Sequence, residues 1–177
     1  PAKVEAWLGS NIVEGIILSG GDASVSDPSF VPPPRRILEL GKPILGICLG
    51  MHWLAKEFGG TVESRPDLAQ YGKTYTLCER VAPIFLELSD SLQQVWESHG
   101  DSVTKVPPSF RVIAWTKGTT DPQAIWYLQR RIVAVQFHPE VVDTPQGKSM
   151  LAGFVFTLCG CEHDWKPASM ILEIQTE

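Results

Sequence analysis

The chain has 177 residues, a formal net charge of −5, and 44% hydrophobic and 20% charged residues. This length and composition predict a globular domain that buries a core without disulfides or a structural metal. The acidic balance disfavours binding to a nucleic-acid backbone as the main activity. No apolar run approaches the ~20 residues that span a bilayer, so we expect no membrane association and a cytoplasmic protein.

The four cysteines are Cys48, Cys78, Cys159 and Cys161. They form no C-x-x-C pair and have no histidine at zinc-finger spacing, so we predict no metal site. Cys159 and Cys161 are too close in sequence for an unstrained disulfide in regular structure. We therefore expect reduced thiols, and only Cys48 has neighbours that indicate chemistry.

The first part of the chain alternates apolar runs with amphipathic stretches. Residues 12–19 predict a strand whose second half is buried on both faces, and residues 35–40 a short helix. Residues 44–48 predict a second buried strand, and residues 49–58 a helix closed by two glycines. Strands that are almost continuously apolar, separated by helices, indicate a parallel sheet covered by helices.

The middle of the chain, residues 61–135, has short alternating runs broken by turn residues, which predict antiparallel strands and hairpins. A buried run at residues 132–137 follows, then helical spacing at 145–158 and a further helix at 167–174. We therefore predict an α/β fold with a mostly parallel central sheet, flanking helices and a small antiparallel addition.

Cys48 lies at a predicted strand-to-helix junction, in the segment Gly46-Ile47-Cys48-Leu49-Gly50. Glycines two residues on either side of a nucleophile are typical of a nucleophile elbow. The turn places the thiol at a helix N-terminus, where the dipole favours thiolate and free N–H groups can stabilise an oxyanion. The alternative is a buried core cysteine beside a tight turn, which is the commoner meaning of this pattern alone.

A second motif, His138-Pro139-Glu140, follows the buried run at residues 132–137. In an extended segment, residues i and i+2 project to the same side, so the carboxylate can reach the imidazole. Such a contact fixes the histidine tautomer and leaves the other ring nitrogen free to take a proton from a thiol. The alternative is a solvated histidine–glutamate pair in a surface loop.

Two further polar segments lie at predicted strand ends. Ser19-Gly20-Gly21 ends a buried strand, at the carboxyl edge where parallel sheets bind ligands. Ser98-His99-Gly100-Asp101 follows the apolar pair Val95-Trp96. Either could be an ordinary turn alone, but the four segments together predict acyl transfer through a thioester.

From about Gly15 to Trp165, these segments resemble the class I, triad-type glutamine amidotransferase domain. Residues 41–51 resemble the nucleophile strand and elbow of that family, and residues 136–141 its His/Glu segment. The resemblance implies that Cys48 attacks the side-chain amide of glutamine, that His138 protonates the departing ammonia and that Glu140 holds His138.

The same resemblance implies the remaining site residues. Backbone N–H groups of Gly21 and Leu49 would be the oxyanion donors. The residues implied to bind glutamine are Gly20, Met51, His52, Ser98, His99, Gly100 and Asp101.

Within the family, residues 98–101 are similar to the branch found in GMP synthetases, as is Cys159-Gly160 followed by Trp165. That branch passes ammonia to ATP-activated xanthosine monophosphate in an ATP-pyrophosphatase domain or subunit, where ATP and Mg would bind. It implies no cofactor in this domain and a homodimeric full-length protein.

The domain organisation follows from the same resemblance. We expect an amidotransferase domain over residues 1–165, without the family's first strand and helix. Residues 166–177 would form a helical tail or linker toward a synthetase domain.

The chain departs from the family pattern at Asp22, where proline is usual, at His52, where glutamine is common, and at Asp143, where histidine is frequent. Three alternatives therefore stay open. The chain could serve another synthetase, such as anthranilate synthase, or be a γ-glutamyl hydrolase. It could also be a catalytically silent docking domain.

Overall fold

The computed structural model describes residues 13–164, so the helix predicted at residues 167–174 lies outside the described residues. The strands are β1 (Ile16–Leu18), β2 (Ile44–Ile47), β3 (Thr61–Ser64), β4 (Gln70–Cys78), β5 (Leu92–His99), β6 (Asp101–Lys105), β7 (Arg111–Thr116), β8 (Pro122–Tyr127) and β9 (Ile132–Val135). The helices are α2 (Leu49–Glu57) and α3 (Gly147–Ala152), which continues as a π-helical turn, η4 (Gly153–Leu158). Short 3-10 turns are η1 (Arg35–Leu38), η2 (Pro83–Phe85) and η3 (Leu128–Arg130).

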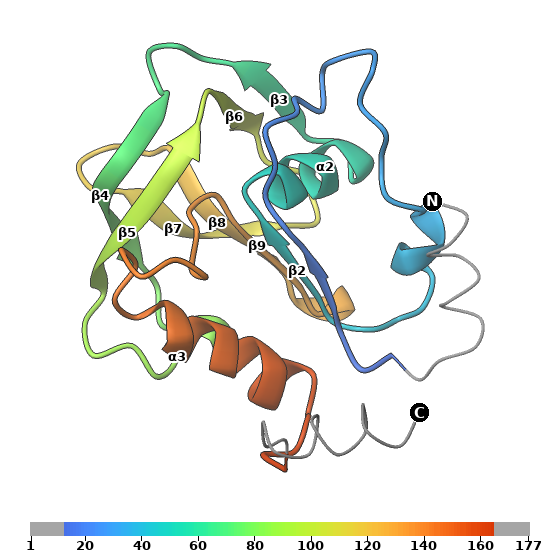
Figure 1. The fold of residues 1–177 in the computed structure, drawn as a ribbon, viewed down its shortest axis with the longest axis vertical. Coiled ribbons are helices and arrows are strands. Elements are labelled where there is room, and N and C mark those ends of the chain that lie inside the picture. Colours follow the sequence, from blue (N-terminus) through green and yellow to red (C-terminus); the bar gives the residue numbers. More distant parts are fainter. Residues whose placement is uncertain (1–12, 165–177) are drawn as a thin grey trace, which may run out of the picture.

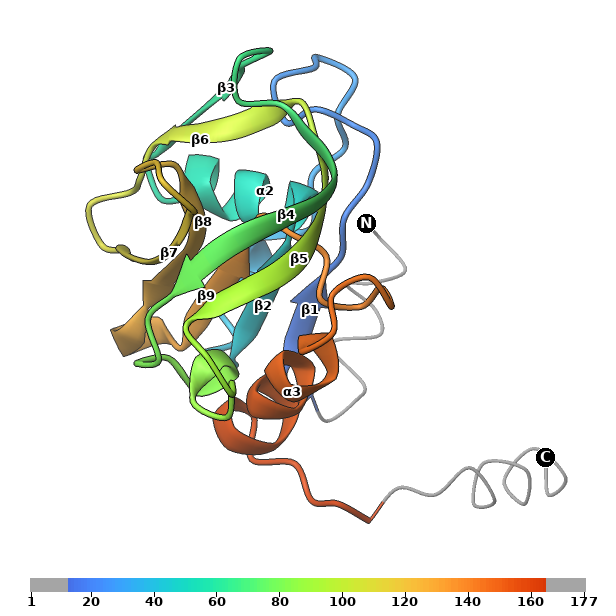
Figure 2. The same ribbon diagram turned by 90° about the vertical axis from the view of Figure 1, so that its left-hand side faces the viewer.

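The main sheet is mixed, with strand order β1-β2-β9-β8-β7-β4-β5, and β3 pairs separately with β6 (Figure 1). Only β1–β2 and β2–β9 are parallel, whereas the four remaining pairings in this sheet are antiparallel. The mostly parallel sheet is thus confirmed only in part, and the antiparallel addition is larger than predicted. Hairpins join β4 to β5 and β7 to β8, and neither connection contains the helical crossover that a parallel pair requires. Figure 2 shows how β4 and β5 curl away from the parallel strands into a half-barrel.

Of the parallel strands, β2 and β9 are covered on both faces. All four residues of β2 are buried, and successive residues face opposite layers. Ile44 belongs to a core with Met51 and Leu54 of α2, whereas Leu45 belongs to a core with Phe154 of η4. Such two-sided burial explains the continuous apolar run in the sequence.

The first strand is shorter than predicted, and its expected burial on both faces is wrong. Ile17, at the centre of β1, is 49% exposed. It borders an apolar cavity of about 670 Å³ that is also lined by Val31 and Trp53. In the described part of the chain, this cavity lies beside β1 and is bordered on its far side by residues 30–34 and by α2.

The junction between β2 and α2 is the sharp turn that the glycine pattern predicts. Cys48 has a φ of 50° and a ψ of −105°, a conformation that an L-residue rarely adopts. Its N–H donates to the carbonyl of Val135 at 2.8 Å, and its own carbonyl accepts from the His52 N–H at 3.1 Å. A Cβ on Gly50 would lie 2.3 Å from the carbonyl oxygen of Leu18, so α2 can approach β1 only with glycine there.

Within residues 13–164, no helix is long and apolar enough to cross a membrane.

Candidate active site

A cavity of about 640 Å³ opens beside the β2–α2 turn, within the ~300–1,000 Å³ range of small-molecule sites. The predicted site residues that line it are Gly21, Cys48, Leu49, His52, Ser98, His99, Gly100, Asp101 and His138. They come from loops and strand ends distant in sequence, which the sheet order brings to one place.

Three predicted residues do not line this cavity: Gly20, Met51 and Glu140. Met51 belongs to α2, and its side chain is fully buried in the hydrophobic core that also contains Ile44. It does not line the cavity. Gly20 lines the neighbouring apolar cavity, and a Cβ added to it would be 2.8 Å from Cε1 of His138 and 3.5 Å from Cβ of Cys48. A side chain at this position would collide with the His138 ring, so glycine leaves room for His138 here, with Cys48 close by.

The His138–Glu140 pair has the geometry that its i, i+2 spacing predicts. Nδ1 of His138 lies 2.7 Å from Oε1 of Glu140. Because a carboxylate only accepts, Nδ1 carries the hydrogen, and Nε2 is the nitrogen that can exchange a proton. Glu140 is half-exposed while His138 is mostly covered, so this pair is not a fully solvated surface contact.

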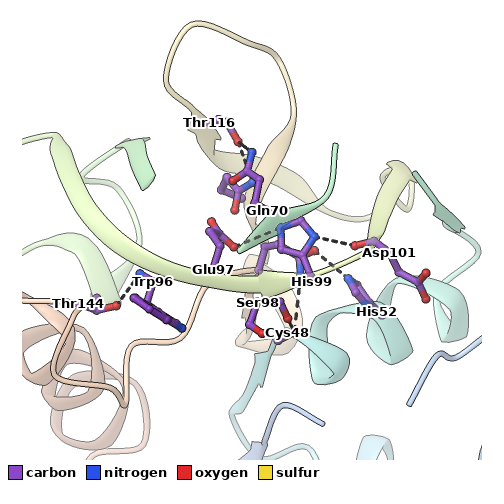
Figure 3. Close-up of polar contacts among 12 residues, drawn as sticks. Cys48, His52, Gln70, Trp96, Glu97, Ser98, His99, Asp101, Thr116 and Thr144 are labelled. Carbon is purple, nitrogen blue, oxygen red and sulfur yellow. Dashed lines mark hydrogen bonds and ion pairs between the residues drawn. The ribbon is translucent and has the colours of Figure 1, made fainter. Parts of the chain in front are cut away.

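A ring of three hydrogen bonds fixes the backbone of His138 against β5. The His138 N–H donates to the Trp96 carbonyl at 2.9 Å, and the Trp96 N–H donates to Oγ1 of Thr144 at 3.0 Å. Thr144 completes the ring by donating its hydroxyl hydrogen to the His138 carbonyl at 2.6 Å. Figure 3 shows Thr144 beside Trp96 on β5. The sequence carries no local signal for this role of Thr144, because the contact joins segments about fifty residues apart.

The surroundings of Cys48 oppose a thiolate in the resting site. Burial raises the pKa of the Cys48 thiol to about 11, and the charges of Glu97, Glu140 and Asp101 add to the rise. A hydrogen bond from the Leu49 backbone acts in the opposite direction but is outweighed. The helix N-terminus thus acts in the predicted direction through Leu49, but desolvation outweighs it in the resting state. The thiol hydrogen can be donated to the Ser98 carbonyl, 3.8 Å from Sγ.

Glu97 and His99 form a buried pair on the inner face of β5, which the sequence analysis missed. Their side chains are 0% and 3% exposed, and Nε2 of His99 lies 3.3 Å from Oε2 of Glu97 (Figure 3). His99 Nδ1 faces the carbonyl of Asp101 at 2.9 Å, so Nδ1 carries a hydrogen. Nε2 and Oε2 must then share one proton, because otherwise two lone pairs would face each other in a buried position. The i, i+2 spacing on a strand was an available signal for this pair.

Two predicted substrate-binding residues are engaged with protein groups. The Asp101 carboxylate accepts a hydrogen bond from the Ser24 hydroxyl, which ties the loop after β1 to the start of β6. His52 is buried, and its Nε2 contacts Oε1 of Gln136 at 2.8 Å. Among residues 13–164, no group of three or more His, Cys, Asp or Glu side chains could hold a metal ion.

Comparison with known families agrees with this geometry. The family model for "Glutamine amidotransferase class-I" matches residues 3–158. The chain belongs to the class I glutamine amidotransferase family. The motifs at residues 46–50 and 138–140 predict this family, and the match confirms that prediction.

Relatives of this amidotransferase chain include GMP synthases. It is 43% identical over 164 residues to the glutamine-hydrolysing GMP synthase of Thermus thermophilus, covering 93% of this chain and 32% of that protein. It is 40% identical over 167 residues to the corresponding enzyme of Aeromonas hydrophila. That match covers 89% of this chain and 31% of the relative. The chain thus spans about a third of the length of these relatives.

Solved structures give the same fold. A Thermoplasma acidophilum protein assigned as one subunit of a GMP synthase has a TM-score of 0.71 and 29% identity, over 97% of this chain and 80% of that one. A glutamine amidotransferase from Thermotoga maritima has a TM-score of 0.61 and 21% identity, over 72% of this chain and 66% of that one.

The hydrogen-bond ring around Thr144 generates a first prediction. Thr144→Val keeps the side-chain shape but leaves the Trp96 N–H and the His138 carbonyl without their partner. We expect a loss of about 1–3 kcal/mol in the free energy of unfolding, measured by urea denaturation. Thr104→Val, at an exposed position of β6, is the matched control and should have little effect. Equal stabilities of the Thr144 variant and the parent would contradict the ring.

The buried Glu97–His99 pair generates a pH-dependent prediction. Burial raises the pKa of Glu97 above its ordinary 4.5, so the folded state holds this proton after the unfolded state has lost it. The stability that Glu97 contributes is therefore complete below about pH 4.5 and declines as the pH rises toward the folded pKa. Glu97→Gln cannot ionise, and its amide can donate to Nε2 of His99.

We therefore expect the stability of Glu97→Gln, relative to the parent, to improve steadily from pH 4 to pH 8 in urea titrations. A stability difference between variant and parent that stays constant from pH 4 to pH 8 would show that Glu97 has the same pKa in the folded and unfolded states.

Proposed function

We propose that this chain hydrolyses glutamine to glutamate and ammonia through a cysteine thioester. The observation that carries the proposal is the placement of His138, bonded to Glu140 at 2.7 Å, together with Cys48 against the same glycine, Gly20. A thiol, an imidazole and a carboxylate in this order form the cysteine version of a catalytic triad.

The proton steps follow from the geometry. Nε2 of His138 takes the thiol proton of Cys48, and the sulfur attacks the side-chain amide carbon of glutamine. The N–H groups of Gly21 and Leu49 stabilise the oxyanion of the tetrahedral intermediate. His138 then gives its proton to the departing nitrogen, ammonia leaves, and a thioester remains. A water molecule, deprotonated by His138, releases glutamate and restores the thiol.

The raised pKa of Cys48 accounts for the need for His138. A thiol with a pKa of about 11 is almost fully protonated near pH 7, so the free enzyme holds little reactive thiolate. Proton transfer coupled to attack avoids a standing thiolate among the carboxylates Glu97, Glu140 and Asp101. Glu140 supports the transfer because its charge stabilises the imidazolium form of His138.

Glutamine binding is proposed for the rest of the cavity wall, including residues 98–101, the loop at Gly20 and the position of His52. Ser98 and Gly100 come from the end of β5 and the turn after it, and both line the cavity. The protein groups already bonded to Asp101 and His52 suggest that these two side chains shape the wall more than they contact glutamine.

For the ammonia, we propose delivery to an ATP-pyrophosphatase synthetase domain or subunit that aminates xanthosine monophosphate to GMP. Support comes from the Ser-His-Gly-Asp segment and from the GMP synthases among the relatives. ATP and Mg would bind in that partner, and residues 166–177 would lead toward it from a domain spanning 1–165. We further propose a cytoplasmic homodimer as the full-length protein, with no nucleic acid as partner.

An amidotransferase of another synthetase, such as anthranilate synthase, would share the whole site, and only the acceptor would differ. A silent docking domain is the second candidate, and the raised pKa of Cys48 favours it in the absence of proton transfer to His138.

The test measures ammonia and glutamate released from glutamine. We expect turnover by the parent chain, none by Cys48→Ala, and a decrease in kcat of about 100-fold for Glu140→Gln. This decrease is at the lower end of the roughly 10²- to 10⁴-fold effects of acid–base groups, because Glu140 is half-exposed. Glu162→Gln, outside the site, is the control. A folded parent chain without turnover would favour the docking domain, and preference for γ-glutamyl peptides would favour the hydrolase.

A further inference from the structure

We propose that the Gln136 carboxamide is a catalytic group of this site, donating an N–H to the Cys48 sulfur and stabilising its thiolate. We further propose that His52 is a positioning residue, which holds the carboxamide in the orientation that makes this donation possible. Both inferences rest on the proposed role of Cys48 as nucleophile.

The three side chains form a continuous buried chain of contacts. Nε2 of Gln136 lies 3.9 Å from Sγ of Cys48, within hydrogen-bond range of sulfur, and Oε1 of Gln136 lies 2.8 Å from Nε2 of His52. Gln136 is 1% exposed, and Cys48 and His52 are 3% exposed. The Gln136 backbone N–H is itself bonded to the Gln123 carbonyl of β8 at 2.8 Å, so the residue is fixed at both ends.

In the structure, the amide oxygen of Gln136 faces His52 and its NH₂ group faces Cys48, an orientation that His52 supports when its Nε2 carries the hydrogen. Burial lowers the pKa of His52, so its ring is neutral near pH 7. With the hydrogen on Nε2, the ring donates to the amide oxygen of Gln136, and the NH₂ group is left to face Cys48. The opposite orientation would point the amide oxygen at the sulfur and repel a thiolate.

The donation matters most after the thiol has lost its proton. In the thiol form, S–H donates to the Ser98 carbonyl, 3.8 Å away. When that proton moves to Nε2 of His138, a carbonyl oxygen is left facing a negative sulfur. The carboxylates of Glu97, Glu140 and Asp101 oppose this charge as well.

Besides the His138 imidazolium, which now carries the proton, the thiolate has the Leu49 backbone N–H and the Gln136 amide as donors. A hydrogen bond to an ionised acceptor is roughly twice as strong as one between neutral groups. The Gln136 contact therefore strengthens as the sulfur becomes anionic, which is the requirement for a group that lowers a barrier.

The test uses the pH dependence of Cys48 alkylation by iodoacetamide, which reports the thiolate without requiring glutamine. The Cys48 peptide is followed by mass spectrometry, because Cys78, Cys159 and Cys161 also react. Gln136→Leu removes the amide at nearly constant shape. We expect its pH midpoint to rise by about one unit or more and its kcat for glutamine to decrease roughly 10- to 100-fold.

Gln123→Leu is the matched control, because it removes an equally buried carboxamide from β8 that bonds Thr116 and not Cys48. Its midpoint should stay at that of the parent. A Gln136→Leu variant that is folded and has the parent's midpoint would overturn the proposal.

The His52 variants supply a second test if Gln136→Leu fails to fold. His52→Leu removes the donor to the amide oxygen, whereas His52→Gln supplies an amide N–H at a similar reach. We expect His52→Leu to raise the midpoint and His52→Gln to raise it less. Equal shifts in both variants would mean that His52 acts only by packing.

The outcome is separable from that of the proposed function. A chain that releases no ammonia but shows the expected order of alkylation midpoints would retain the Gln136 role in activating the thiol. Normal glutamine turnover by the parent, with an unchanged alkylation midpoint in Gln136→Leu, would support the proposed glutaminase activity and contradict the proposed role of Gln136.

Discussion

The site depends on one turn of backbone, between β2 and α2. Cys48 adopts an unfavourable positive φ there, and it can do so because its N–H is bonded to Val135 of β9 and its carbonyl starts the helix hydrogen bonds. The strain is tolerated because β2 is fully buried between β1 and β9. Every other site residue is placed with reference to this turn: Gly20 from β1, His138 and Gln136 from the end of β9, and Ser98 from β5.

Burial gives this site both its rigidity and its chemical difficulty. The same packing that fixes the elbow removes water from the sulfur and raises the pKa of Cys48 to about 11. Three carboxylates lie close enough to add to that effect. A thiolate can therefore form only when its proton has a defined acceptor and its charge has defined donors. In our account, His138 is the acceptor, and the Leu49 and Gln136 N–H groups are the donors.

Local patterns in the sequence predicted the parts of the site that are local in the structure. The elbow and the His138–Glu140 contact are each contained within five residues, so glycine spacing and strand alternation were sufficient. The parallel strands β2 and β9 could also be predicted, because burial on both faces leaves a continuous apolar run. The large antiparallel half-barrel was underestimated, since short alternating strands do not indicate which neighbour they pair with.

The missed features are tertiary. Thr144 reaches Trp96 across about fifty residues of sequence, and Gln136 reaches Cys48 across 88. No spacing rule reports such contacts. The net rise in the pKa of Cys48 could not be predicted for the same reason, because the helix N-terminus is visible in the sequence and desolvation is not. Exposure of Ile17 likewise depends on what lies beside β1.

The central claim is that Cys48 is a nucleophile assembled with His138. The most direct measurement is the intact mass of the folded protein after treatment with a glutamine-like electrophile, for the parent, Cys48→Ala and His138→Ala. Our account predicts a single adduct on the parent, its disappearance in Cys48→Ala and its slower formation in His138→Ala. An adduct that persists in Cys48→Ala, or a folded parent that forms none, would contradict it.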